Sequence, residues 1–158
     1  MSPQPEDEPI TPEGLLALKQ ELHDLETRAR REIAKRILTA RELGDLKENA
    51  EYHAAKEDQS HLETRILRLQ QRLRAAVVVQ TEAGDDVFAF GHTAEVLDET
   101  TDTVHTWRIV GATEADLSQG LLSAQSPVAK ALIGRAPGEL VEVPTPKGAR
   151  RLRIQRLL

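Results

Sequence analysis

The stretch Gly44-Asp45-Leu46-Lys47-Glu48-Asn49 separates two long segments with helical periodicity. Apolar residues recur at spacings of three and four on both sides of it: Leu15, Leu18, Leu22, Leu25, Ala29, Ile33, Ile37 and Ala40 before it, and Leu62, Ile66, Leu69, Leu73 and Ala76 after it. Such spacing is typical of two helices that share one apolar seam. Because only a short loop joins them, we expect an antiparallel helical hairpin over residues 10–76, with its tip at 44–49.

The residues at the ends of the two segments predict where the helices begin and end. Thr11 and Pro12 are typical of an N-cap and a first helical position, and Gly44 is a natural end for the first helix. The second helix is expected from about Asn49 onwards. Before the first helix, residues 1–9 are rich in proline and acids, which predicts a disordered leader.

Residues 80–158 have a different pattern, in which β-branched and apolar runs alternate with turn residues. Strands are predicted over residues 93–97, 104–110, 138–143 and 149–157. Ser126-Pro127 is typical of the start of a short helix. The predicted fold class is therefore α+β: an antiparallel coiled-coil hairpin over residues 10–76, followed by a small, mostly antiparallel β-domain with one short helix over residues 80–158.

The composition excludes several classes of protein. The 158 residues have a net charge of −5, which argues against a protein that coats duplex nucleic acid. Aromatic residues make up only 3%, which argues against binding single strands by base stacking. The chain has no cysteine, so it has no disulfide or thiolate metal site, which suits the cytoplasm. No apolar run approaches the roughly 18 residues of a membrane span.

Asp45 and Glu48 lie in the predicted tip, and their spacing allows two interpretations. The Asp-x-x-Glu pattern is a capping box, in which both acids would stabilise the start of the second helix. Alternatively, the two carboxylates are presented to a hard cation such as Mg²⁺, which is usually held by one or two carboxylates together with water and phosphate. Two acids alone would bind Mg²⁺ weakly, so a partner would have to supply further ligands.

The residues around the tip resemble a known family. The stretch RELGDLKENAEYHAAKE over residues 41–57 is similar to the tip signature of the bacterial GreA/GreB transcript cleavage factors, and closest to that of GreA. TWRIVG over 106–111, EAD over 114–116 and SPVAKALIG over 126–134 resemble the C-terminal pattern of the same family, in the same order. The resemblance covers roughly residues 10–158, far more than one short motif.

The resemblance implies a function. In this family the coiled coil enters the secondary channel of RNA polymerase, and the C-terminal domain is FKBP-like. The tip acids, here Asp45 and Glu48, help to hold Mg²⁺ and a water in the polymerase active site. The polymerase then cleaves backtracked RNA near its 3′ end, so the factor is not itself an enzyme. The resemblance also implies a cytoplasmic monomer that does not bind membranes.

The resemblance assigns roles to five further residues. Arg41 and Lys56 flank the tip and would contact the 3′ segment of the nascent RNA, whereas without the resemblance they are simply solvated. Gln125, Ser126 and Pro127 would dock on the rim of the polymerase channel. Gln125 is not a diagnostic residue, since acids occur at this position in related factors.

Three alternatives follow from the same residues. A Gre-fold inhibitor would enter the same channel without stimulating cleavage. A coiled-coil scaffold would bind a partner and use Asp45 and Glu48 only as helix caps. His53, Glu57 and His61 recur at intervals of four on one helix face, a spacing that would suit a transition metal if a fourth ligand were present.

Overall fold

The computed structural model describes residues 7–80 and 86–158, and it divides into two units. One, the hairpin unit, comprises Leu15–Ala76, and the other, the β unit, comprises Met1–Gly14 and Val77–Leu158. None of the helices in the described ranges is long and apolar enough to cross a membrane.

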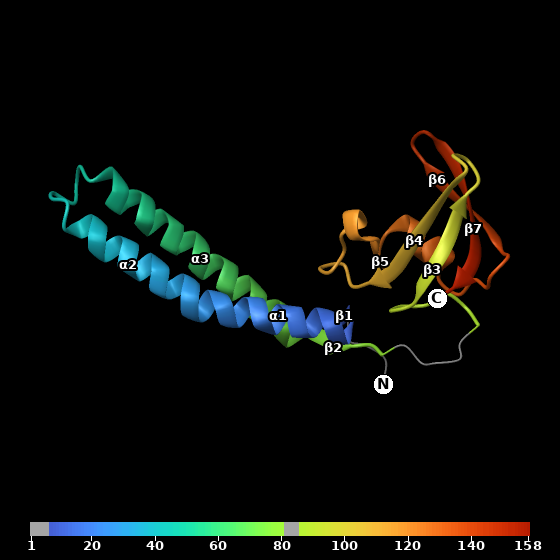
Figure 1. The fold of residues 1–158 in the computed structure, drawn as a ribbon, viewed down its shortest axis with the longest axis horizontal. Helices are drawn as coiled ribbons and strands as arrows, with labels where there is room; N and C mark the ends of the chain where they lie inside the picture. Colours follow the sequence, from blue (N-terminus) through green and yellow to red (C-terminus); the bar gives the residue numbers. More distant parts are fainter. Residues whose placement is uncertain (1–6, 81–85) are drawn as a thin grey trace. The chain divides into compact units, whose positions relative to one another are not determined.

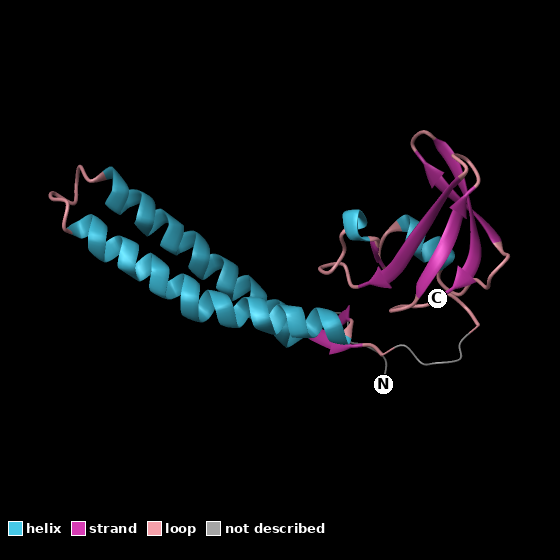
Figure 2. Cartoon of the chain, in the orientation of Figure 1, coloured by secondary structure: helices cyan, strands magenta, loops and turns pink. Residues whose placement is uncertain are grey.

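Two long antiparallel arms form the hairpin. The first arm runs through α1 (Pro12–Asp24), η1 (Leu25–Ala29) and α2 (Arg30–Arg41), and α3 (Ala50–Ala75) returns beside it (Figures 1 and 2). The seam predicted from the heptad spacing is buried at Leu18, Leu22, Ala40, Ile66 and Leu69, and Ala55 of α3 is buried as well. Alanines occupy the seam towards the tip, whereas leucines and isoleucine occupy it farther away, so the helices are free to approach closely near the loop.

The first arm is not a continuous α-helix, because η1 is a π-helical turn. The apolar positions Leu25, Ala29, Ile33 and Ile37 are spaced by four each time, instead of alternating between three and four. This spacing adds one residue to the heptad pattern. A π-helical turn has one more residue than an α-helical turn, and such turns occur mostly as single bulges within α-helices. The extra residue is therefore accommodated while the following apolar positions stay on the seam.

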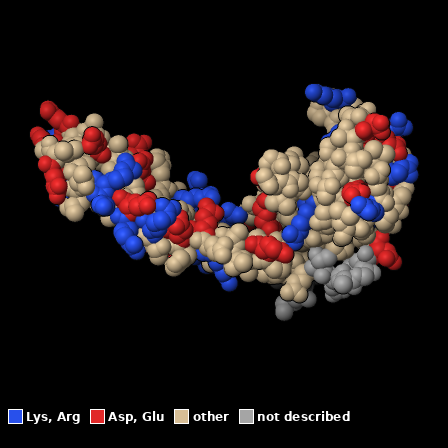
Figure 3. Space-filling view, in the orientation of Figure 1, with Lys and Arg blue, Asp and Glu red and all other residues tan. Residues whose placement is uncertain are grey.

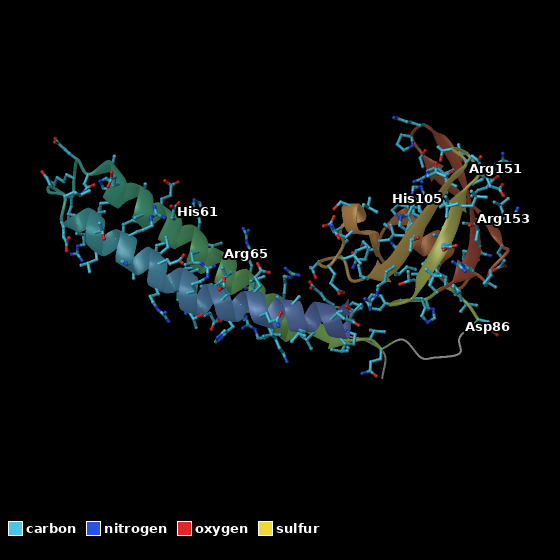
Figure 4. All side chains as sticks on the ribbon, viewed as in Figure 1. His61, Arg65, Asp86, His105, Arg151 and Arg153 are labelled. Atoms are coloured by element: carbon cyan, nitrogen blue, oxygen red, sulfur yellow. The ribbon has the colours of Figure 1, made fainter. Side chains whose placement is uncertain are left out.

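Charged side chains connect the two arms at three levels, through Arg65–Glu21 at 2.7 Å, Arg30–Glu63 at 2.9 Å and Arg36–Asp58 at 2.9 Å. All six side chains are more than 40% exposed, so solvent weakens each pair to about 0–1 kcal/mol. Figure 4 shows Arg65 on α3. The pairs favour one register of the helices, and the buried seam supplies most of the stability.

The β unit contains a five-stranded sheet in the order β5-β4-β3-β7-β6. Its strands are β3 (Thr93–Asp98), β4 (Thr103–Val110), β5 (Leu121–Ser123), β6 (Leu140–Thr145) and β7 (Gly148–Leu157). All pairs are antiparallel except β4 with β5. The helix α4 (Pro127–Leu132) and the short 3-10 turn η2 (Leu117–Gln119) complete the unit. The α+β fold class predicted from the sequence is confirmed.

The core of the β unit is formed by alternating strand residues and by side chains from α4 and the loops. Val96, Ile109, Leu132, Leu152 and Ile154 are fully buried there. Three aromatic residues contribute to it: Phe88 and Trp107 are buried in the core, and Phe90 packs against the core. Phe88 and Phe90 lie in a loop and not in a strand, with Phe88 N–H donating to the Arg135 carbonyl at 2.8 Å.

A small second sheet pairs β1 (Glu8–Ile10) with β2 (Ala76–Val78). The predicted disordered leader over residues 1–9 is therefore wrong at Glu8 and Pro9, and residues 1–6 lie outside the described part of the chain. Beyond the strands, Val79 N–H donates to the Ile10 carbonyl at 2.9 Å. The partners of β1 are far away in the sequence, so local composition gave no indication of this pairing.

Candidate functional site

The loop at the tip of the hairpin is formed by local backbone turns. After α2 ends at Arg41, the N–H groups of Glu42 and Leu43 donate to the Thr39 and Ala40 carbonyls at 3.2 and 3.1 Å. Gly44 then has a φ of +127°, a conformation that side chains disfavour, so this position suits glycine. Every residue from 41 to 48 is exposed. In Figure 3, acidic side chains gather at the end of the hairpin that carries this loop.

The structure brings Asp45 and Glu48 together. Both line a shallow depression of about 380 Å³, which is also lined by Leu43, Asn49, Ala50 and Glu51. The Asp45 Oδ1 accepts a hydrogen bond from Lys47 N–H at 3.0 Å, which fixes the carboxylate within its own turn. Among the described residues, no hydrogen bond or ion pair engages the Glu48 carboxylate. Most of the acceptor capacity of the two acids is therefore available to a partner.

Asn49, and neither acid, caps the second helix. Its side-chain Oδ1 accepts from Tyr52 N–H at 3.0 Å, and α3 begins at the next residue. The capping-box interpretation of Asp45 and Glu48 is therefore wrong, because Asp45 lies four residues before the cap and bonds only within the loop. The acids are not needed to start the helix, so the structure gives them no capping role.

The chemistry of the two acids suits a hard divalent cation. Exposed carboxylate oxygens are the ligands that Mg²⁺ takes from proteins, usually one or two at a time. Within residues 7–80 and 86–158 there is no group of three His, Cys, Asp or Glu side chains that would hold a metal ion alone. The tip therefore fits a shared site, in which another molecule supplies the remaining ligands.

Arg41 and Lys56 lie near the tip on the two helices. Arg41 is the last residue of α2 and is exposed, while Lys56 is exposed on α3 and donates from Nζ to Gln59 Oε1 at 2.9 Å. In the described part of the chain neither is in an ion pair with an acid. Their positive charges are therefore not neutralised by the hairpin itself.

Gln125, Ser126 and Pro127 lie at the start of α4. The Ser126 Oγ accepts from Ala129 N–H at 3.1 Å and donates to the Ser123 carbonyl at 2.7 Å, so Ser126 is an N-cap. Pro127 occupies the first helical position, as the sequence predicts. Gln125 and Pro127 are exposed and Ser126 is half-buried, which leaves the first two accessible.

The three residues considered as a transition-metal site do not converge. The ring Nε2 of His53 lies 3.2 Å from the Lys47 carbonyl, whereas the ring of His61 faces Glu57 at 3.6 Å. Figure 4 shows His61 on α3. His53 on α3 therefore contacts the tip loop, and His61 forms an exposed pair with Glu57.

Asn49 is the tip residue that the sequence analysis missed. Besides capping α3, its Nδ2 donates to the Ala40 carbonyl in the last turns of α2, at 2.6 Å. The available signal was that Asn is as good an N-cap as Asp and lies directly before the helical run. The bond to Ala40 depends on the folded hairpin and has no local signature.

Sequence comparisons identify the family. Residues 8–78 match the family model described as transcription elongation factor, N-terminal, and residues 82–157 match the model described as transcription elongation factor, GreA/GreB, C-term. The chain belongs to the GreA/GreB family of transcription elongation factors. The transcription elongation factor GreA of Nautilia profundicola is 51% identical over 151 residues, covering 95% of this chain and 93% of that protein. The GreA of a Jannaschia species is 46% identical, covering 94% and 96%.

Solved structures of related factors were also found. GreA factor homolog 1 of Thermus thermophilus is 27% identical with a TM-score of 0.43, covering 96% of this chain and 99% of that one. A GreA/GreB factor of Nitrosomonas europaea is 28% identical with a TM-score of 0.41, covering 65% and 89%. The family assignment rests on the sequence matches. It confirms the prediction of a GreA/GreB transcription elongation factor that acts on RNA polymerase and is not itself an enzyme.

Proposed function

We propose that this GreA/GreB factor inserts its hairpin into the secondary channel of RNA polymerase and stimulates the polymerase to cleave backtracked RNA. The observation that carries the proposal is the position of Asp45 and Glu48: both are exposed at the tip of a long arm and neither caps a helix. The 26 residues of α3 span roughly 39 Å at ~1.5 Å per residue. An arm of this length suits delivery of the two acids to a buried active site.

Asp45 and Glu48 would supply anionic oxygens to a Mg²⁺ ion that is shared with the polymerase. A bound Mg²⁺ lowers the pKa of a coordinated water and stabilises the charge that develops on a phosphoryl group. The hydrogen bond from Lys47 N–H restrains the Asp45 carboxylate before it meets the ion. Because the tip carries no third ligand in the described residues, the polymerase must complete the site, and stimulation requires both molecules.

Two other regions have supporting roles in this proposal. Arg41 and Lys56, whose charges are not neutralised by the hairpin, would attract the phosphates of the displaced 3′ segment of the nascent RNA. The segment Gln125-Ser126-Pro127 would dock on the rim of the channel, through the exposed side chains of Gln125 and Pro127. The factor would act in the cytoplasm as a monomer.

The scaffold alternative has lost its main support, because it required Asp45 and Glu48 to be helix caps and Asn49 has that role. The inhibitor alternative makes a different prediction from the proposal: the wild-type factor would bind the polymerase and leave the RNA intact. The same experiment therefore separates the two.

The test uses backtracked elongation complexes with labelled RNA, to which the factor is added at saturating concentration with Mg²⁺. We expect the wild type to shorten the RNA. The double variant Asp45→Asn, Glu48→Gln should bind the polymerase equally well in competition, but cleave at least about 100-fold more slowly, because amides lack the charge that the ion needs.

Glu57→Gln is the matched control, since Glu57 is an exposed acid on the same hairpin but away from the tip loop. It should cleave at the wild-type rate. Wild-type binding without RNA shortening would identify an inhibitor. Full cleavage by the double variant would remove Asp45 and Glu48 from the mechanism.

A further inference from the structure

Asn49 connects the two helices at the tip. Its Nδ2 donates to the Ala40 carbonyl at 2.6 Å, and its Oδ1 accepts from Tyr52 N–H at 3.0 Å. It is half-buried, whereas residues 41–48 are all exposed. One side chain thus links the end of α2 to the first turn of α3, and it closes the loop that carries Asp45 and Glu48.

The rest of the tip loop is held by few contacts. Lys47 N–H donates to Asp45, and the Lys47 carbonyl lies 3.2 Å from Nε2 of His53 on α3. The backbone turns at Glu42 and Leu43 extend only to the end of α2. Among the described residues, Asn49 is therefore the side chain that ties both ends of the loop together by hydrogen bonds.

We propose that Asn49 is a positioning residue, which sets the loop conformation in which Asp45 and Glu48 can share one ion. The inference rests on the proposed function, since it assigns Asn49 a part in the same tip site. Asn49 does not touch the ion or the RNA in this role. It acts through the loop, by fixing where the loop leaves α2 and where it enters α3.

The chemistry of an amide explains why asparagine is needed. One side chain must donate to a carbonyl and accept from an N–H, and the amide group has a donor and an acceptor. Aspartate would cap α3 as well as asparagine does, but it cannot donate to the Ala40 carbonyl and would bring a negative charge close to it. Asn49→Asp therefore keeps the capping hydrogen bond from Tyr52 N–H and removes the hydrogen bond to the Ala40 carbonyl.

The test compares the wild type with Asn49→Asp on the same backtracked complexes over a range of Mg²⁺ concentrations. We expect the helical content and polymerase binding of Asn49→Asp to match the wild type, because the cap is kept, and the thermal midpoint to fall by no more than a few degrees from the lost bond to Ala40. Cleavage at saturating factor should fall by about tenfold or more, and the Mg²⁺ concentration for half-maximal stimulation should rise, because the two acids are misplaced.

Asn49→Ser is the second variant, since serine also caps a helix but cannot reach across to Ala40. It should show the same loss and the same rise in Mg²⁺ requirement. A residue that only stabilised the helix would leave the Mg²⁺ requirement unchanged in both variants. That result would overturn the positioning role even if cleavage fell.

The link can also be observed directly, because Asn49 is the only asparagine in the chain. Selective ¹⁵N labelling of asparagine gives one side-chain amide pair, whose protons should exchange slowly with solvent if one of them is bonded to Ala40. Rapid exchange of both protons would contradict the inference.

The cleavage outcomes separate the two proposals. If the wild type shortens RNA and Asn49→Asp matches it at every Mg²⁺ concentration, the positioning role falls and the proposed function stands. If the wild type does not shorten RNA, the proposed function fails and the positioning role fails with it.

Discussion

The acids at the tip of the hairpin and Glu114, which follows β4 and contacts the residue before α1, have opposite surroundings. Glu114 accepts from Thr11 N–H at 3.1 Å and from Gly111 N–H at 2.9 Å, and it also accepts from the Thr11 hydroxyl. The Thr11 Oγ1 in turn accepts from Gly14 N–H at 3.0 Å. At the tip, Asp45 accepts one bond and Glu48 accepts none from the described residues.

The difference teaches how to tell a structural acid from one that is available for function. The Glu114 carboxylate accepts hydrogen bonds from the almost fully buried Thr11 and from nearby backbone N–H groups. Little of its acceptor capacity therefore remains for a partner molecule. The tip acids have no comparable contacts to lose. Removing Glu114 should therefore affect folding, whereas removing a tip acid should affect only activity.

The largest expected effect on stability follows from Glu114→Ala. The change leaves the N–H groups of Thr11 and Gly111 without their acceptor, and the buried Thr11 hydroxyl loses the carboxylate to which it donates. We expect the free energy of unfolding, measured by urea denaturation, to fall by about 2–4 kcal/mol. Asp45→Ala is the matched variant and should change it by less than about 0.5 kcal/mol. Equal decreases in the free energy of unfolding of the two variants would show that Glu114 is no more important for the fold than Asp45.

A pH titration extends the contrast to Asp98, which is 1% exposed. Burial acts to raise its pKa, but hydrogen bonds from Arg150 and from Thr100 N–H outweigh it and hold the pKa below the usual value of 3.8. A carboxyl whose pKa is lower in the folded state stabilises the fold above its unfolded pKa. That stability is lost as the pH falls through the folded pKa.

We therefore expect the free energy of unfolding to decrease below about pH 4 in the wild type. The decrease should be shallower in Asp98→Asn, which does not titrate at this position. The effect should be smaller than that of Glu114→Ala, because Asp98 remains bonded until the pH falls well below 4. Parallel curves for the two proteins would mean that Asp98 contributes nothing to acid sensitivity.

The smallest expected effect concerns the exposed pair Arg36–Asp58, which joins the two arms at 2.9 Å. In a double-mutant cycle with Arg36→Ala and Asp58→Ala, the coupling energy should be about 0–1 kcal/mol and should decline as salt is added. A coupling above about 2 kcal/mol would show that the arms depend on charge pairs, and not on the buried seam.

Most of the fold could be predicted from periodicity alone, because the buried seam and the alternating strands repeat at regular intervals. The errors occurred where a distant partner decides the structure. Glu8 and Pro9 read as a leader by composition, yet they pair with β2. The loop that carries Phe88 is likewise held by a distant residue, since Phe88 N–H donates to the Arg135 carbonyl.

The candidate site could also be predicted only in part, because local sequence places the loop but does not show its contacts with the folded hairpin. Asp45 and Glu48 were found because the loop interrupts the helical pattern and resembles a family signature. The capping role was wrong because both Asp45 and Asn49 are preferred N-cap residues, and local sequence does not decide between them. In the structure Asn49 is the cap, and it also donates to the Ala40 carbonyl, a bond that exists only once the hairpin is folded.

The π-helical turn at Leu25–Ala29 has a consequence for changes in chain length. Elsewhere in the first arm, an inserted or deleted residue would rotate the rest of the α-helix by about 100°, and this would turn the apolar face of α2 away from α3. Deleting one residue from this turn would instead leave an uninterrupted α-helix, with the apolar positions of α2 still facing α3. This turn is therefore a position at which the first arm can lose one residue without a change in the direction in which Asp45 and Glu48 point.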